Sequence, residues 1–134
     1  MTAKIVYTGN LRAELTHLDS GTMILNDAPK DNQGNGASFS PTDMVATALG
    51  SCMAITMGIY ARNHGLDVDG TTVEITKVMA SNPRRIARIE AILTMPKDRD
   101  FSEKDRATLE RVAHTCPVGQ SLHPDLEQVI KFNW

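Results

Sequence analysis

The sequence predicts an α+β domain with a mainly antiparallel sheet and two helices. Short alternating segments fill the first forty residues, a long helical run follows, and further alternating segments flank a second helical segment, giving the order β-β-β-α-β-β-α-β. Short turns join most neighbouring strands, which favours antiparallel pairing. The 134 residues fit a single domain, 1–134, that is large enough to bury its own core.

The N-terminal third of the chain predicts three strands joined by turns. The strands are expected at residues 3–8, 11–18 and 22–26. Gly9-Asn10 is suited to the first hairpin turn, and residues 26–38 contain the Asp, Asn, Gly and Pro residues of a loop. Arg12 falls on the polar face of the second strand, so on pattern alone it is a solvated strand residue.

A long central helix is expected to begin after Ser40. This serine is a good N-cap, Pro41 suits the first helical position, and Asp43 completes a capping box. The helix is expected to end near His64-Gly65, about 35 Å from its start. Helical spacing predicts one apolar face, made by Val45, Ala48, Leu49, Cys52, Thr56 and Ile59.

The C-terminal half predicts three more strands and a second helix. The strands are expected at residues 71–79, 85–95 and 127–134. Ser102 and Asp105 form a second capping box, which opens a helix that runs to about Thr115 and is stopped by Pro117. The apolar stripe of this helix consists of Leu109, Val112, Ala113 and Cys116.

Composition and charge exclude several classes of function. The formal net charge of −2 gives no electrostatic argument for binding nucleic acid. The stretch from Met44 to Tyr60 is too short and too polar to predict a membrane span, and the polar N-terminus does not resemble a signal peptide. We therefore expect a cytoplasmic protein without nucleic-acid or membrane partners.

The histidines do not indicate a metal site. His114 and Cys116 have no companion ligand pair, which argues against a zinc site.

The two cysteines are the candidate centre of any chemistry. Cys52 and Cys116 each fall on the apolar stripe of a predicted helix, and helices in a two-layer domain often pack together. The pattern leaves three readings open: free thiols, a redox pair, or two small buried hydrophobic side chains. For Asp43 the capping box is by itself a sufficient explanation.

Two segments resemble the OsmC/Ohr family, the osmotically induced and organic-hydroperoxide-resistance proteins. The first runs from Phe39 to Cys52 and contains the Ser-Pro helix start and the Ala-Leu-Gly-Ser-Cys run. The second runs from His114 to Leu122 and contains Cys-Pro-Val at the close of the second helix. The predicted order of strands and helices also fits this family over nearly the whole chain.

The resemblance implies an intertwined homodimer, in which the sheets wrap around the helices, with thiol peroxidase activity. Cys52 matches the family's peroxidatic cysteine, and Cys116 matches its resolving cysteine. Arg12 is the expected cation beside Cys52, because it is the only arginine before residue 62 and the family uses an arginine from this region. In well-known members a glutamate directly after the proline holds that arginine; this chain has Thr42 there and an acid, Asp43, one position later.

The implied reaction needs no bound cofactor, because an external thiol or dithiol reduces the cysteine pair. A pocket for an organic hydroperoxide is expected beside Cys52. Its lining is expected to consist of Thr42 and of three apolar residues of the same helix, namely Leu49, Met53 and Met57. Two alternatives remain open. The shifted acid and the Met-rich helix also suit a dimer that binds a small apolar ligand without turnover. Oxidant sensing by the cysteine pair is the other.

Overall fold

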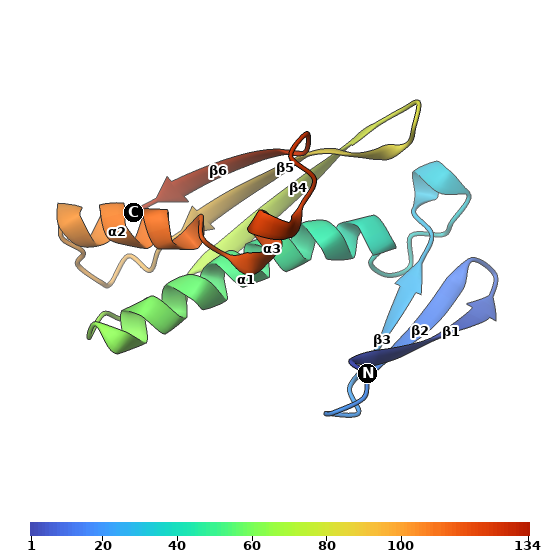
Figure 1. Cartoon of the computed structure of the whole chain (residues 1–134), viewed down its shortest axis with the longest axis horizontal. Coiled ribbons are helices and arrows are strands. Elements are labelled where there is room, and N and C mark those ends of the chain that lie inside the picture. Colours follow the sequence, from blue (N-terminus) through green and yellow to red (C-terminus); the bar gives the residue numbers. More distant parts are fainter. The chain divides into compact units, whose positions relative to one another are not determined.

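A computed structural model describes all residues from 1 to 134 (Figure 1). The chain forms two compact units, unit 1 (Met1–Val45) and unit 2 (Ala46–Trp134). The order of elements agrees with the sequence prediction and confirms the α+β class. The structure adds a short 3-10 helix, η1, and a short third helix, α3, that the sequence pattern did not predict.

Unit 1 is a three-stranded antiparallel sheet followed by a loop and the first turn of the long helix. The strands, in the sheet order β1-β2-β3, are β1 (Ala3–Gly9), β2 (Arg12–His17) and β3 (Met23–Asp27). The predicted hairpin turn is confirmed, and Gly9 and Asn10 there adopt φ values of 89° and 52°. The loop contains η1 (Lys30–Asn32).

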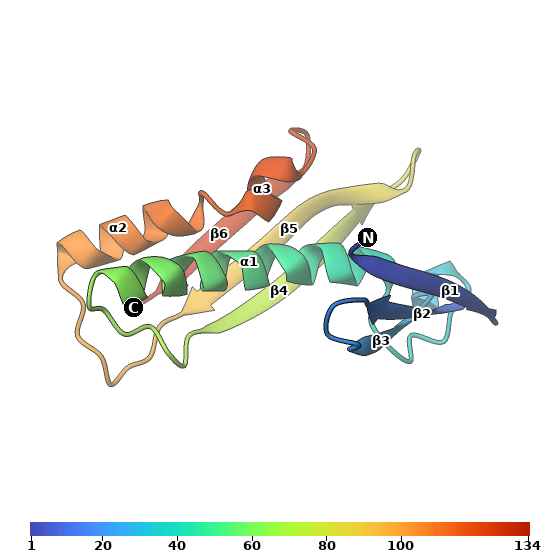
Figure 2. The same ribbon diagram turned by 60° about the horizontal axis from the view of Figure 1, so that its bottom comes forward.

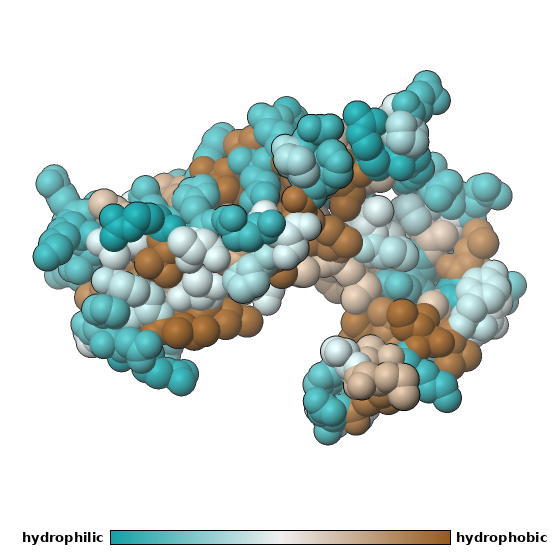
Figure 3. Space-filling view, in the orientation of Figure 1, coloured by the Kyte–Doolittle hydropathy of each residue, from teal (hydrophilic) through white to brown (hydrophobic).

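The few buried residues of unit 1 are all polar. Asn26 donates from Nδ2 to the carbonyl of Phe39 at 3.0 Å, and Asp27 accepts from the N–H of Ala37 at 2.8 Å. Ser40, the third buried residue, caps the following helix. Exposed apolar side chains lie on the strands, and Figure 3 shows several of them as brown surface. Among them are Ile5, Tyr7, Met23, Ile24 and Leu25.

Unit 2 is a second three-stranded sheet with helices on one face (Figure 2). Its strands, in the sheet order β4-β5-β6, are β4 (Thr72–Ala80), β5 (Arg85–Thr94) and β6 (Glu127–Asn133). β4 and β5 are antiparallel, whereas β5 and β6 are parallel. Its helices are α1 (Pro41–Asn63, which starts in unit 1), α2 (Glu103–Ala113) and α3 (Pro117–Ser121).

Local sequence signals set the ends of both long helices. At the start of α1, Ser40 N donates to the Asp43 carboxylate at 2.9 Å and Asp43 N donates to the Ser40 hydroxyl at 3.1 Å, so the predicted capping box is confirmed. Gly65, with φ of 69°, follows the end of α1, where Leu66 N donates to the carbonyl of Ala61. At α2, the hydroxyl of Ser102 accepts from Asp105 N at 3.1 Å.

The core of unit 2 lies between α1 and the central strand β5. Ile89, Ala91 and Leu93 of β5 are fully buried on one face of the sheet. The side of α1 that packs in this core consists of Ala46, Leu49, Met53, Met57 and Ala61. Gly50 lets α1 approach β4, because a Cβ there would lie 2.7 Å from Ile75 Cδ1.

The predicted apolar face of α1 does form one face of the helix, since Ala48, Cys52, Thr56 and Ile59 line a common groove, but it is not the face that packs in the core. Leu49 is buried, but Val45, Ala48 and Ile59 are exposed and Cys52 is half-buried. The helix carries apolar residues on two faces, and periodicity alone does not tell which of them meets the sheet.

α1 is long and apolar enough, by length and composition, to cross a membrane, and no other helix is. Core helices of globular proteins pass the same test. Its Leu49, Met53 and Met57 pack in the core of unit 2, so α1 is a core helix.

Candidate functional site

Unit 2 brings the two predicted cysteines together. Cys52 lies in the middle of α1, and Cys116 lies in the link between α2 and α3. The prediction placed Cys116 on the second helix, but α2 ends at Ala113 and Cys116 is the N-cap of α3. Both cysteines are free thiols; Cys52 is half-buried, whereas Cys116 is fully buried. The two thiols are neighbours, since the N–H groups of the adjacent residues Val118 and Gly119 reach one sulfur each.

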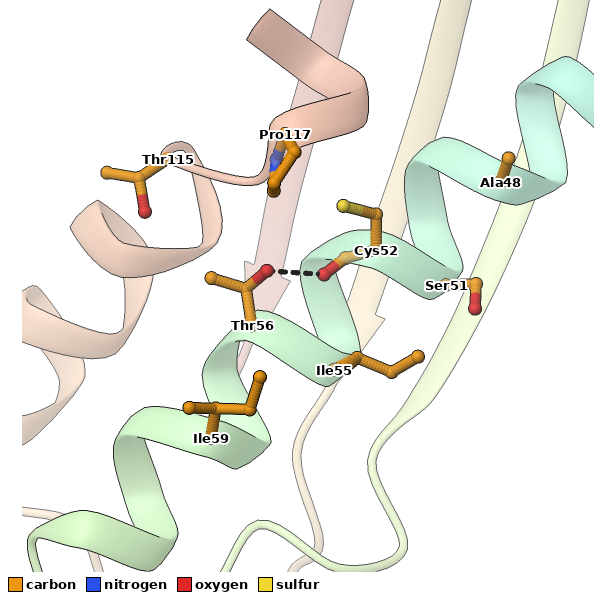
Figure 4. A pocket seen from close by; sticks show the side chains of 8 residues that line it. All are labelled: Ala48, Ser51, Cys52, Ile55, Thr56, Ile59, Thr115 and Pro117. Atoms are coloured by element: carbon orange, nitrogen blue, oxygen red, sulfur yellow. Dashed lines mark hydrogen bonds between the residues drawn. The ribbon is translucent and has the colours of Figure 1, made fainter. Parts of the chain in front are cut away.

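Pro117 explains why the chain turns at the second cysteine. A proline cannot continue α2, because it lacks an N–H, but it suits the first position of a new helix. The chain therefore stops α2 and starts α3 at Pro117. Figure 4 shows the Cys52 sulfur directed toward this segment.

Backbone N–H groups of α3 contact both sulfur atoms. Val118 N donates to Cys52 Sγ at 3.5 Å, and Gly119 N donates to Cys116 Sγ at 3.3 Å. N–H donors favour the thiolate form of an acceptor sulfur. The α3 turn therefore supplies donors to whichever of the two sulfurs carries negative charge.

Burial raises the pKa of the Cys116 thiol. The N–H of Gly119 works against this effect, and the neighbouring Cys52 thiol adds to it. A buried thiol with a raised pKa stays protonated and reacts slowly with reagents in solution. The two cysteines thus have different environments: Cys116 is enclosed, whereas Cys52 has a path to solvent.

Cys52 opens on an apolar groove of about 630 Å³ in unit 2. The groove is lined from α1, from the link between α2 and α3, and from the first residue of α3, as Figure 4 shows. Its lining residues, none of them charged, are Ala48, Ser51, Cys52, Ile55, Thr56, Ile59, Thr115 and Pro117. Thr56 is oriented by a hydrogen bond from its hydroxyl to the Cys52 carbonyl at 2.7 Å. The site can therefore hold a small apolar molecule against a thiol.

The predicted pocket residues lie elsewhere. Leu49, Met53 and Met57 are fully buried in the core and do not line the groove. They are neighbours of Cys52 in sequence, but they project toward the sheet, because one helical step rotates a side chain by about 100°. Thr42 lies in the first turn of α1, where its hydroxyl is 3.1 Å from that of Ser40. Ile55 and Ile59 are the apolar groove residues in their place.

Within unit 1, the carboxylate that pairs with Arg12 is Asp27. Arg12 Nε lies 3.6 Å from Asp27 Oδ1, and the Asp27 side chain is 1% exposed. The sequence pattern predicts a loop over residues 26–38, which contains Asp27, and gives no sign of this pairing. The pairing follows from the register of the hairpin, since Arg12 and Asp27 are directly opposite on β2 and β3. Asp43 is engaged at the N-terminus of α1 through Ser40.

No group of three or more His, Cys, Asp or Glu side chains is placed to hold a metal ion. The chemistry that the site offers is that of two adjacent thiols beside an apolar groove.

The fold and site define a class: small α+β proteins with a thiol pair between a central helix and a Cys-Pro turn. The sequence profile described as "OsmC-like protein" matches residues 34–129, so this chain belongs to the OsmC-like family. No curated protein sequence matches the chain.

Solved structures share this fold over nearly the whole chain. A crystal structure from Psychrobacter arcticus 273-4, provisionally described as an osmotic stress induced and detoxification response protein, is 44% identical. It aligns with a TM-score of 0.94 over 99% of this chain and 96% of its own. An OsmC-like protein of unknown function from Vibrio cholerae is 14% identical, with a TM-score of 0.79 over 97% and 96% of the two chains. The organic hydroperoxide resistance protein OhrB of Bacillus subtilis is 16% identical, with a TM-score of 0.72 over 99% and 98%.

Proposed function

We propose that this protein reduces organic hydroperoxides with its two thiols, as part of a response to peroxide stress. The observation that carries the proposal is the asymmetry of the cysteine pair: Cys52 opens on an apolar groove, and Cys116 lies buried beside it. Membership of the OsmC-like family supports it. The descriptions of two structural relatives also support it: one is described with a "detoxification response", and the other with "organic hydroperoxide resistance".

In the proposed reaction the Cys52 thiolate attacks the terminal oxygen of a hydroperoxide. An S–O bond forms and the O–O bond breaks, so that the alcohol leaves after taking up a proton and Cys52 becomes a sulfenic acid. Cys116 then attacks the Cys52 sulfur, forming the disulfide and releasing water. An external dithiol returns two electrons and two protons and is itself oxidised to a disulfide. The raised pKa of Cys116 is consistent with this role, because the thiol stays protonated until the sulfenic acid has formed at Cys52.

The groove favours an organic substrate over hydrogen peroxide. Ile55, Ile59 and Pro117 offer apolar surface to an alkyl or aryl group beside Cys52. Hydrogen peroxide gains nothing from such contacts. We expect cumene hydroperoxide to be consumed faster than hydrogen peroxide, and a clear preference for hydrogen peroxide would contradict the substrate class.

Arg12 is proposed as the cation that activates Cys52. Cys52 lies about three turns into α1, too far from its N-terminus to benefit from the helix dipole. The family resemblance points to an arginine of the N-terminal strands for this task, and the buried carboxylate of Asp27 is placed to hold Arg12. We propose that Asp27 takes the role that the resemblance suggested for Asp43.

We also propose a cytoplasmic homodimer. The apolar strand residues of unit 1, including Ile5 at 65% exposure, form a surface that a second copy would cover. Sedimentation at several protein concentrations tests the oligomeric state, and a monomer at all concentrations would contradict it.

The decisive experiment compares Cys52→Ser with Cys116→Ser, with a dithiol as reductant. Cys52→Ser is expected to reduce hydroperoxide consumption to background, because serine does not act as the nucleophile at neutral pH. Cys116→Ser, treated with one equivalent of hydroperoxide in the absence of reductant, is expected to retain a sulfenic acid at Cys52, because no thiol is then available to condense with it. A dimedone adduct detects this sulfenic acid by mass spectrometry. An unchanged rate in Cys52→Ser removes this cysteine from the mechanism.

A second candidate function is binding of a small apolar ligand without turnover. Thr42, where well-known family members carry a glutamate, and the uncharged groove favour it. This alternative predicts no peroxide consumption by the intact protein and slow alkylation of Cys52, whereas a peroxidase rate eliminates it. Oxidant sensing, the third reading, predicts disulfide formation with one equivalent of hydroperoxide but little turnover.

A further inference from the structure

The α3 turn holds its N–H donors against the thiol pair through one side chain of β6. Gln128 Nε2 donates to the carbonyl of Gly119 at 2.9 Å. Gly119 is the residue whose N–H reaches Cys116 Sγ, and it directly follows Val118, whose N–H reaches Cys52 Sγ. One amide side chain therefore fixes the peptide segment that carries both donors.

The space around Gly119 shows how closely this segment approaches the sulfurs. A Cβ at this position would lie 3.1 Å from Gln128 Oε1, 3.2 Å from Cys116 Sγ and 3.3 Å from Leu49 Cδ1. These separations are tighter than most real Cβ contacts. The lack of a side chain at Gly119 thus lets the backbone approach both Cys116 Sγ and the Gln128 amide that holds it.

The donors have an electrostatic consequence because the rest of the groove has no charged side chain. The residues that line it in unit 2 are neutral, and the titratable neighbour of Cys52 there is Cys116. Hydrogen bonds to a charged acceptor are stronger than those to a neutral one, so an N–H donor favours a thiolate over a thiol. Small displacements of the turn would weaken both bonds, which are already 3.5 Å and 3.3 Å long.

We propose that Gln128 is a positioning residue for the cysteine pair: by holding the Gly119 carbonyl it keeps the Val118 and Gly119 N–H groups aimed at the two sulfurs, where they stabilise the negative charge of the reacting thiolate. The inference builds on the proposed thiol function. In that cycle the charge lies on Cys52 before its attack on the peroxide, and on Cys116 when an external thiolate attacks Cys52 and breaks the disulfide.

The test is the pH profile of Cys52 alkylation in the full-length reduced protein. Iodoacetamide reacts with the thiolate, and peptide mass spectrometry identifies Cys52 as the modified residue. Gln128→Met keeps the length of the side chain but removes the donor. We expect its profile to shift upward by as much as roughly one pH unit, which slows alkylation at neutral pH by up to roughly tenfold, with an unchanged plateau rate at high pH.

Gln120→Met is the matched control. Gln120 Nε2 donates to the carbonyl of His114, also at 2.9 Å, but that peptide carries no donor to either sulfur. We expect this variant to keep the wild-type midpoint. A wild-type midpoint in Gln128→Met overturns the inference, and so does an equal shift in Gln120→Met, because the effect would then be general loosening of α3.

Two features keep the test decisive. If Gln128→Met fails to fold by circular dichroism, Gln128→Asn, which retains the amide but shortens its reach, replaces it with the same expected direction of shift. Alkylation requires no peroxide, so a wild-type protein without peroxidase activity would end the proposed function while the Gln128 comparison would still decide the positioning role.

Discussion

Unit 1 and unit 2 differ in what they bury. Every buried hydrophobic residue of the chain belongs to unit 2, from Ala46 to Cys116, whereas the buried residues of unit 1 are Asn26, Asp27 and Ser40. Burial of apolar surface is the main term that offsets the loss of chain entropy on folding. Unit 2 therefore has its own source of stability, and unit 1 depends on strand pairing, on polar contacts and on whatever covers its apolar strands.

The same contrast separates the chemistry. The thiol pair lies in unit 2, where packing fixes Cys116 at 0% exposure beside Cys52. The Arg12–Asp27 pair lies in unit 1, where a cross-strand register fixes it. The thiol pair is thus positioned by a hydrophobic core, whereas the Arg12–Asp27 pair is positioned by the pairing of two strands.

The largest difference between the units is expected from truncation of apolar side chains. Leu49→Ala removes a fully buried side chain of unit 2 and should lower the free energy of unfolding by about 2–5 kcal/mol, measured by urea denaturation with reductant present. Ile24→Ala in unit 1, where the side chain is 46% exposed, should change it by within about 0.5 kcal/mol in the isolated chain.

The proposed dimer adds a second expectation for Ile24→Ala, namely weaker self-association in sedimentation experiments. Equal losses of unfolding free energy for Ile24→Ala and Leu49→Ala in the isolated chain would break the comparison between the units.

The buried carboxylate of unit 1 is expected to make Arg12 matter for stability. Arg12→Leu leaves the Asp27 carboxylate buried without its ion-pair partner and should cost about 1–3 kcal/mol, limited because the Arg12 side chain is 45% exposed. Combining it with Asp27→Asn, which keeps the acceptor for Ala37 N–H, should recover part of the loss. Additive costs in this double-mutant cycle, measured by chemical denaturation, would show that the two side chains do not interact.

Alkaline pH is expected to weaken unit 2 through Cys116. Its pKa is raised in the folded state, chiefly by burial, so the folded chain holds the thiol proton at pH values where the unfolded chain has lost it. The contribution to stability is present below the unfolded pKa of about 8.5 and is lost as the pH rises toward the folded value. Unfolding free energy should fall there by at most about 1.4 kcal/mol per pH unit.

Cys116→Ala provides the control for this pH effect, because it removes the titrating group. Denaturation curves at several pH values between 8 and 11 should show a smaller slope in this variant. The same slope in both proteins would assign the effect to another group.

The smallest expected loss of unfolding free energy comes from removing the N-cap serine of either helix. Ser102→Ala should cost about 1 kcal/mol, the usual value for an N-cap serine. Ser40→Ala should cost at least as much, because Ser40 is fully buried and its loss leaves Asp43 N–H without that acceptor. A smaller loss for Ser40→Ala would indicate that water replaces the cap in unit 1.

Sequence by itself determined the features that depend on neighbouring residues. The order of elements, the capping boxes at Ser40 and Ser102, and the stop at Pro117 are local, since each needs only a few adjacent residues to form. The buried face of β5 is local too, because Ile89, Ala91 and Leu93 alternate with more exposed residues along the strand. The importance of Cys52 and Cys116 also came from the sequence, through the motifs around them.

Only the tertiary structure decided which groups meet. It placed one apolar face of α1 in the core and left the other along the groove, so that Ile55 and Ile59, rather than Met53 and Met57, line it. It set Asp27 opposite Arg12 through strand register and brought Gln128 of β6 to the turn beside the thiols. These contacts join residues that are distant in sequence, and the energy that selects them comes from packing of the whole unit rather than from local preference.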